Sequence, residues 1–528
     1  MKRSSLLWPA RLIRAAAALA LATMWTFGTS APALAGEPIN GSGSTWSANA
    51  IERWISNVKS YGLVVNYSSI GSSAGRAQFK SGVTDFGVSE IPFGVTPGEN
   101  PPTRSYAYMP VVAGGTSFHY HIEVGGRKFT NLKLSGETIA KIFTGKITNW
   151  NDPAITHDNG TALPSKKIIP VVRSDGSGTS AQFTLWMANQ YASIWNPFCQ
   201  RYLGGQFCGF TSNYPQFPGA KALAGSDGLS NFIHASYGDG AIGYVEYSYA
   251  LEKGDPVAKV LNHGGYYVLP TASNVAVALT QARINSDLTQ NLGGVYTYSD
   301  PRAYPLSSYS YFLLPVGSNS GISTGKGNTL SRFGGYFLCQ GQSYVSNIGY
   351  SPLTKNLVEA GFTQIRRIPG ADVSNINLAT CGNPTMQNGH NVLLEHAPCP
   401  PPEDGTPGAH CGGQAARPNQ PGTGGGGGAG SGAGGGTGAG AGNGTGAGAG
   451  PNAQTSANAT GIDPETGQPY GTKGTGTDVA GRPVSLDSSF LGGGAMTVVL
   501  GAIAVVSLLC AVIGPPALSR IMRRGGTG

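Results

Sequence analysis

Three short segments of the chain share one pattern, in which glycine and a hydroxyl residue precede the start of an amphipathic helix. They are Gly41–Trp46, Gly71–Gly75 and Arg173–Ser180. Glycine lets the backbone approach a ligand closely, hydroxyl groups donate hydrogen bonds, and the free N–H groups at a helix N-terminus favour an anion. One such segment is an ordinary helix cap. Three of them, the last with an arginine, predict a pocket that surrounds a small oxyanion.

Arg173 is the residue most specific to this prediction. It follows an apolar run, Lys167–Val172, which is typical of a buried strand that would present the guanidinium to a cleft. A guanidinium recognises a tetrahedral oxyanion with several donors at once, and Asp175 is placed to hold it. Further donors at the start of the next expected helix are Ser177, Gly178 and Thr179.

Each of these residues also has a simpler interpretation. Ser44, Thr45 and Ser72 are ordinary N-cap residues for the helices expected after them. Arg173 on its own is equally consistent with a surface charge. The anion site therefore depends on the three segments being brought together.

The elements around these segments indicate a mixed α/β fold. Residues 49–58 carry apolar side chains at helical spacing, and residues 241–247 form a short apolar run typical of a buried strand. Alternation of such elements predicts α/β architecture with ligands at the carboxyl ends of the strands. The region from Glu37 to Gly370, about 330 residues, is long enough for two lobes rather than one core.

The segment Val171–Ser180 resembles the signature loop of the phosphate-binding component of bacterial ABC-type phosphate importers. Four more segments agree with that family in order and spacing, namely Gly43–Trp46, Gly71–Ser73, Ile142–Trp150 and Gly240–Tyr247. The resemblance covers most of residues 38–368. The start Ile39-Asn40-Gly41 is also similar to the related DING phosphate-binding proteins, although Pro38 stands where they have an aspartate.

The resemblance implies a two-lobed periplasmic-binding-protein fold of type II that closes on dehydrated phosphate. Lobe 1 would comprise about residues 36–110 and 273–370, and lobe 2 about 111–272, with hinge crossovers near 108–115 and 269–274. By position, the phosphate ligands would be Thr45, the backbone of Trp46, Ser72, Arg173, Ser177, Gly178 and Thr179, with Asp175 in support. Closure would bury the anion among neutral donors and one arginine, which suits a group too costly to bury unpaired.

Glu90 is a departure from that family, which has an aspartate at this place in the segment 85–90. A carboxylate there accepts the proton of hydrogen phosphate and repels sulfate, which has no proton to give. Glutamate keeps the acceptor but extends it by one methylene, so the pocket must shift or the ligand must differ. Alternatively, Glu90 points elsewhere and Asp85 has only a structural role.

Both ends of the chain carry targeting patterns. Residues 1–35 combine basic residues, an apolar stretch and a small-x-small site, which predicts a secretory signal peptide. Residues 491–518 lack charge and are followed by a basic tail, 519–528, which predicts one membrane span with the N-terminal domain outside the cell. Without the four basic residues of the first end and the three of the last, the net charge of +8 becomes +1. The basic pI therefore does not indicate nucleic-acid binding.

Residues 371–490 are first rich in Cys and Pro and then in Gly and Ala, which predicts a disordered linker that tethers the domain to the membrane. The six cysteines before the span predict disulfides in an oxidising compartment. Proximity favours the pairs Cys199–Cys208, Cys339–Cys381 and Cys399–Cys411, but six cysteines allow 15 connectivities.

The sequence does not indicate an enzyme, a metal site or a cofactor. It has no C-x2–4-C pair and no recognisable Ser/His/Asp order. His119 and His121 share one side of a strand without a nearby carboxylate, so we expect them to pack in the structure. The expected partners are inorganic phosphate and the permease and ATPase subunits of an importer, with no nucleic acid and a monomeric chain. The alternatives are a membrane-tethered sensing or adhesion module and a binder of another oxyanion.

Overall fold

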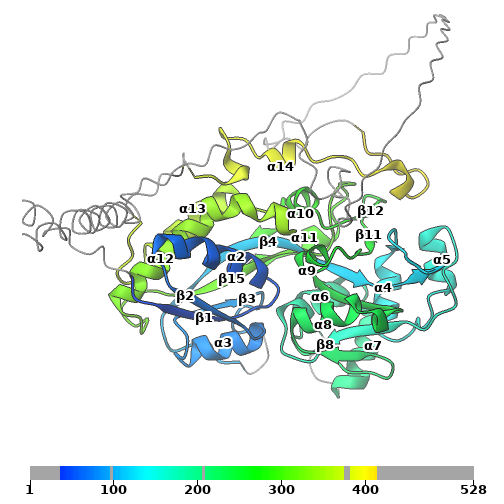
Figure 1. Ribbon diagram of the computed structural model, residues 1–528, viewed down its shortest axis with the longest axis horizontal. Coiled ribbons are helices and arrows are strands. Elements are labelled where there is room, and N and C mark those ends of the chain that lie inside the picture. Colours follow the sequence, from blue (N-terminus) through cyan, green and yellow to red (C-terminus); the bar gives the residue numbers. More distant parts are fainter. Residues whose placement is uncertain (1–35, 96–98, 205–208, 374–377, 379–380, 413–528) are drawn as a thin grey trace, which may run out of the picture.

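The computed structural model describes residues 36–95, 99–204, 209–373, 378 and 381–412, and every structural statement below concerns these residues. One eight-stranded sheet, in the order β2-β1-β3-β15-β4-β10-β8-β9, runs through the body (Figure 1). We call the part from β2 to β15 the first half of the sheet and the part from β10 to β9 the second half. Strand β4 lies between the two halves.

The first half combines parallel and antiparallel pairs. Its strands are β1 (Ile39–Gly43), β2 (Val65–Ser69), β3 (Phe86–Ser89) and β15 (Ser307–Pro315), of which β1, β2 and β3 are mutually parallel. Its helices are α2 (Ala48–Val58), α3 (Ser72–Lys80), α12 (Thr324–Leu338) and α13 (Lys355–Ile365). The helix predicted over residues 49–58 is confirmed as α2, which buries Ile51, Trp54 and Val58.

The second half contains β8 (Ile169–Arg173), β9 (Lys221–Leu223) and β10 (Ala241–Glu246), and β8 is parallel to both of its neighbours. Its helices are α4 (Gly136–Phe143), α5 (Pro153–Asn159), α6 (Gly178–Gln190), α7 (Ala192–Leu203), α8 (Gly225–His234) and α9 (Tyr247–Glu252). The strands predicted before Arg173 and over residues 241–247 are therefore confirmed as β8 and β10.

Strand β4 (Tyr106–Tyr120) joins the two halves because it changes partners along its length. It pairs with β15 up to Gly115 and with β10 from Thr116. A side chain at Gly114 would meet the ring of Trp46 at 2.8 Å. Glycine at this point therefore lets the indole of the first glycine–hydroxyl segment pack directly on the strand that spans both halves.

The remaining elements are small. A three-stranded sheet has the order β12-β11-β7, with β7 (Lys133–Leu134), β11 (Lys259–Leu261) and β12 (Tyr267–Val268). Two hairpins pair β5 (Glu123–Val124) with β6 (Arg127–Lys128) and β13 (Arg283–Ile284) with β14 (Gln290–Asn291). The short helices α10 (Ala272–Leu279), α11 (Gly293–Tyr296) and α14 (Val392–Glu395) complete the body.

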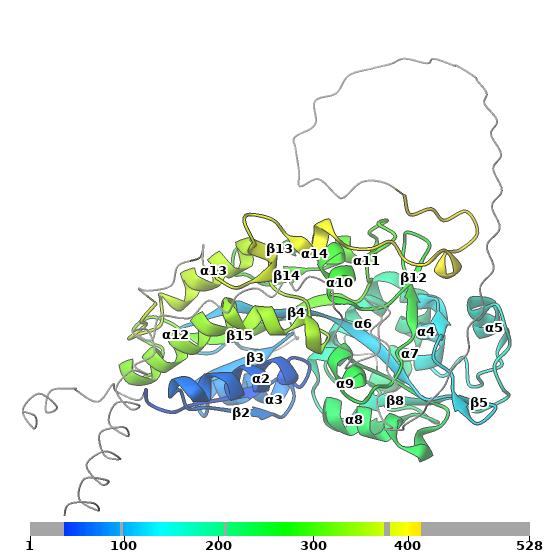
Figure 2. The same ribbon diagram turned by 45° about the horizontal axis from the view of Figure 1, so that its top comes forward.

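Residues 381–412 pack against the body although the composition from residue 371 onward predicted a linker. Figure 2 shows this yellow segment crossing from α14 toward β12. The disulfides Cys339–Cys381 and Cys399–Cys411 fix it, so two of the favoured pairs are confirmed. The buried Asp404 forms ion pairs with Lys133 at 3.0 Å and Lys259 at 2.6 Å. Specific cross-links and buried ion pairs thus fold a segment that has few apolar residues.

Several predictions from the sequence concern residues that the structure does not describe. Within the ranges that the structure describes, no helix has the length and apolar character needed to cross a bilayer. The span predicted over 491–518 lies outside those ranges, as do the signal segment 1–35, the rest of the linker and the tail 519–528. Cys208, the favoured partner of Cys199, is also outside them.

Candidate functional site

The three glycine–hydroxyl segments meet at the junction between the two halves of the sheet. Each follows the carboxyl end of a strand, namely β1, β2 and β8. Ser73 N donates to the carbonyl oxygen of Gly176 at 3.0 Å, and Gly178 N donates to Ser72 Oγ at 3.1 Å. The segments that the sequence predicted to act together are therefore in direct contact.

Arg173 is the only arginine among the predicted site residues, and it is 2% exposed. Its Nε donates to Asp175 Oδ1 at 2.7 Å and its Nη2 donates to Asp175 Oδ2. Burial raises the pKa of Asp175, but the hydrogen bonds and the charge of Arg173 outweigh that effect and lower the pKa below its usual value. The ionised carboxylate fixes the plane of the guanidinium.

The start of α6 adds donors next to Arg173. Ser177 is the N-cap of this helix, and its Oγ accepts a hydrogen bond from Ser180 N at 3.1 Å. Thr179 Oγ1 is buried, and it has no hydrogen-bond partner in the described part of the chain. A buried hydroxyl without a partner is uncommon, because leaving it unpaired costs free energy, and it is available to a ligand.

The hydroxyls of the first half do not cap helices, so the simpler interpretation is wrong for them. The N-cap of α2 is Ser47 and that of α3 is Gly71. Thr45 Oγ1 instead lies 2.8 Å from Ser226 Oγ across the junction. The backbone N–H of Trp46, which the resemblance assigns to phosphate, donates to Ser44 Oγ at 3.0 Å.

Glu90 lies fully buried in the middle of these donors. Its Oε1 accepts hydrogen bonds from Ser44 Oγ at 2.6 Å and Ser310 Oγ at 2.7 Å, and its Oε2 accepts from Ser72 Oγ at 2.7 Å. Burial raises the pKa of Glu90, and the three hydroxyls offset this rise only in part. The alternative in which this side chain points elsewhere is wrong.

Asp85 lies outside this group. Its Oδ2 accepts from Asn40 N at 2.8 Å, and its Oδ1 pairs with Lys326 Nζ at 3.0 Å. Both contacts tie β1 and α12 to the segment that leads into β3. Asp85 therefore has a structural role, whereas Glu90 lies beside the glycine–hydroxyl segments through Ser44 and Ser72.

Three further residues line the junction that the sequence did not single out. Ser226 lies at the start of α8, and Arg173 Nη1 donates to its Oγ at 3.4 Å. Gln182 Nε2 donates to the carbonyl oxygen of Glu90 at 2.8 Å, and Ser310 comes from the middle of β15. The Gly225-Ser226 pair at the start of α8 repeats the glycine–hydroxyl pattern and was detectable from the sequence. Gln182 and Ser310 have no local signal.

His119, on β4, belongs to a different cluster, and the expectation that no carboxylate lies near the histidines was wrong. His121 follows the end of β4, and its Nδ1 lies 2.9 Å from the carbonyl oxygen of Ile233. Asp255 Oδ2 lies 3.0 Å from His119 Nε2 and 2.8 Å from His234 Nδ1, while Lys128 Nζ lies 2.5 Å from its Oδ1. Burial lowers the pKa of His119, and Asp255 offsets this only in part. Among the described residues, no group of three or more His, Cys, Asp or Glu side chains is arranged to hold a metal ion. This cluster holds β4, β6 and α8 together.

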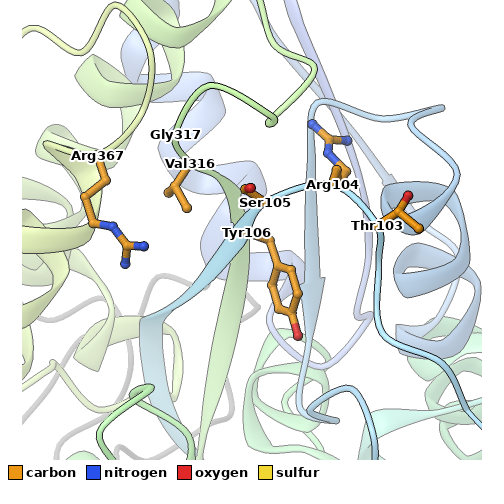
Figure 3. Close-up of a pocket in the computed structure, with 7 residues that line it drawn as sticks. All are labelled: Thr103, Arg104, Ser105, Tyr106, Val316, Gly317 and Arg367. Carbon is orange, nitrogen blue, oxygen red and sulfur yellow. The ribbon is translucent and has the colours of Figure 1, made fainter.

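A surface hollow of about 680 Å³ lies where β4 begins and β15 ends (Figure 3). Its lining residues are Thr103, Arg104, Ser105, Tyr106, Val316, Gly317 and Arg367. Arg104 donates to the carbonyl oxygens of Phe79, Thr84 and Ser320, so backbone groups occupy its guanidinium. We place the functional site at the junction, where a buried arginine and a free hydroxyl meet.

An α/β body in which two parts of one sheet meet over a buried arginine, hydroxyls and a helix N-terminus defines a solute-binding protein. The family model described as a PBP superfamily domain matches residues 28–339, which is more than half of the chain. The phosphate-binding protein PstS of Pasteurella multocida is 31% identical over 338 residues, which cover 63% of this chain and 91% of that protein. PstS 2 of Mycobacterium tuberculosis is 32% identical over 287 residues, covering 52% and 72% respectively.

A solved structure of a high-affinity periplasmic phosphate-binding protein, PfluDING with bound phosphate, is 19% identical with a TM-score of 0.46, and the match covers 67% of this chain and 99% of that one. The chain belongs to the PstS family of phosphate-binding proteins within the PBP superfamily. It is accordingly a binding protein and not an enzyme.

Proposed function

We propose that this chain captures inorganic phosphate at the junction of the two halves and delivers it to an ABC importer. The observation that carries the proposal is the buried guanidinium of Arg173, held in plane by Asp175. A buried charge of this kind is stabilised by an anionic ligand, and its planar fork suits a tetrahedral oxyanion. Relatives named phosphate-binding proteins support phosphate as that oxyanion.

The donors around Arg173 have distinct roles in this proposal. Thr45, the backbone of Trp46 and Ser72 bind phosphate from the first half. Ser177, Gly178 and Thr179 bind it from the N-terminus of α6, where the helix dipole favours an anion. The partner-free hydroxyl of Thr179 supports this assignment. Strand β4 and the connection near residues 269–274 act as the hinge between two lobes, which correspond to residues 36–110 with 273–370 and to residues 111–272.

Cellular location is a further part of the proposal. A signal peptide over residues 1–35 exports the domain, and a helix over residues 491–518 anchors it to the membrane through a glycine-rich tether. The basic residues after that span support an orientation with the binding domain outside the cell. Phosphate then passes to the permease and ATPase subunits of the importer.

Titration calorimetry of the full chain in detergent tests the ligand. We expect phosphate and arsenate to bind, because both are tetrahedral and can carry a proton, and sulfate to bind about 100-fold more weakly. Absence of heat with phosphate, or tighter binding of sulfate, would contradict the proposal. Loss of phosphate uptake after deletion of the gene separates delivery to an importer from a sensing or adhesion role.

A further inference from the structure

The Glu90 carboxylate engages groups that the proposed function assigns to phosphate, so the inference below rests on that function. Ser72 O–H and Gly178 N–H are two of the donors assigned to phosphate. In the structure they form a chain, because Gly178 N donates to Ser72 Oγ at 3.1 Å and Ser72 Oγ donates to Glu90 Oε2 at 2.7 Å. Phosphate would need both donors for itself.

Glu90 also lies against the N-terminus of α6. A Cβ atom built on Gly178 would lie 1.8 Å from Glu90 Oε2, so the carboxylate lies against the first residue of this helix. A carboxylate and a phosphate oxygen prefer the same partners, namely hydroxyls and N–H groups at a helix N-terminus. The side chain thus engages one donor assigned to phosphate, Ser72, and lies against a second, Gly178.

The other oxygen of Glu90 explains how the side chain is held there. Ser44 and Ser310 donate to Oε1, and Gln182 bonds the backbone carbonyl of the same residue. The carboxylate is therefore fixed on three sides by the protein. An aspartate at this position would be shorter by one methylene and would stop short of Ser72 and Gly178.

We propose that Glu90 is an internal competitor of the bound oxyanion, so that phosphate binds only when the carboxylate withdraws from Ser72 and Gly178. The long side chain lowers the affinity of the site for phosphate, and it does so by occupying donors and by repelling a second negative charge. Glu90 is thus a residue that tunes affinity and selectivity from within the pocket.

Shortening the side chain tests the proposal. We expect Glu90→Asp in the full chain to bind phosphate about tenfold more tightly than the wild type, because the donors of Ser72 and Gly178 are released. We expect Glu90→Ala to bind both phosphate and sulfate more tightly. The substitution removes both the side chain that engages the anion donors and the negative charge that repels an anion. Glu137→Asp, at an exposed glutamate of α4, is the matched control and should leave the affinity unchanged.

Calorimetry with phosphate and sulfate separates the possible outcomes, with circular dichroism to establish that each variant is folded. Weaker phosphate binding by both Glu90 variants would overturn the proposal, since Glu90 would then contribute to binding rather than compete with it. Unchanged binding would also overturn it, while the proposed function would stand because the wild type binds phosphate. If neither the wild type nor any variant binds phosphate, the proposed function itself fails, and the inference falls with it.

Discussion

Two carboxylates at the junction, Asp175 and Glu90, come from different halves of the sheet and behave in opposite ways. Asp175, in the second half, accepts hydrogen bonds from the guanidinium of Arg173, and its side chain is 20% exposed. Glu90, in the first half, is fully buried and accepts hydrogen bonds from the neutral hydroxyls of Ser44 and Ser72. The pKa of Asp175 is lowered, whereas burial raises the pKa of Glu90. A carboxylate beside a cation positions that cation to donate to the ligand. A carboxylate among neutral hydroxyls instead accepts hydrogen bonds that those hydroxyls would otherwise donate to the ligand.

Removal of Arg173 is the largest change that this comparison predicts. We expect Arg173→Ala to weaken phosphate binding about 1,000-fold, because the pocket loses its cation and Asp175 remains without its partner. Titration calorimetry measures the loss, and Arg127→Ala, at an exposed arginine, serves as a control for charge alone. Affinity close to that of the wild type would mean that the ligand does not contact Arg173.

Asp175→Asn tests whether Asp175 positions the guanidinium of Arg173 for the ligand. We expect phosphate affinity to fall about tenfold to 100-fold, since the guanidinium loses two charge-assisted hydrogen bonds that hold its plane. The same substitution in an Arg173→Ala background should have little further effect on phosphate affinity, because Asp175 acts on the ligand by holding the arginine. Tighter binding in the single variant would place Asp175 with Glu90 as a competitor.

Thr179 provides a contrast with Ser72, because its hydroxyl has no hydrogen-bond partner among the described residues, whereas that of Ser72 donates to Glu90. Thr179→Val keeps the shape and removes one donor. We expect phosphate to bind about three- to tenfold more weakly, which corresponds to one hydrogen bond. The melting temperature of the protein without added ligand should not fall, and a large fall would indicate that the hydroxyl is structural.

The dependence of stability on pH gives the smallest effect, and its sign differs between the two carboxylates. Because the pKa of Glu90 is raised, the folded protein keeps this proton at a pH where the unfolded chain has released it, so the group lowers stability as the pH rises above about 4.3. The pKa of Asp175 is lowered, so this group adds stability above about pH 3.9, which is lost on acidification.

Thermal unfolding of Glu90→Gln and Asp175→Asn between about pH 2.5 and 8 measures this difference, because the contribution of Asp175 changes below its unfolded pKa of about 3.9. Relative to the wild type, we expect the melting temperature of the first variant to rise with pH and that of the second to fall, each by about 2–4 °C. Parallel curves for the two variants would show that both carboxylates have the same environment in the folded protein.

Much of the site was predictable because its signals are local. Helix N-terminal N–H groups, the hydroxyls beside them and an arginine at a strand end are properties of a few consecutive residues, as in Arg173–Ser180. Ser310 and Asp255 were not predictable, because their partners are distant in sequence. Ser310 meets Glu90 from 220 residues away, and Asp255 meets His119 from 136 residues away.

The sequence by itself determined which family the chain resembles, and it predicted an oxyanion pocket and the loops that would form it. It also identified Glu90 as an unusual residue, but not where its carboxylate lies. Only the tertiary structure decided this, because the hydroxyls that fix the carboxylate come from three separate elements, at Ser44, Ser72 and Ser310. A side chain one methylene longer becomes an occupant of the site only when folding brings those donors within its reach.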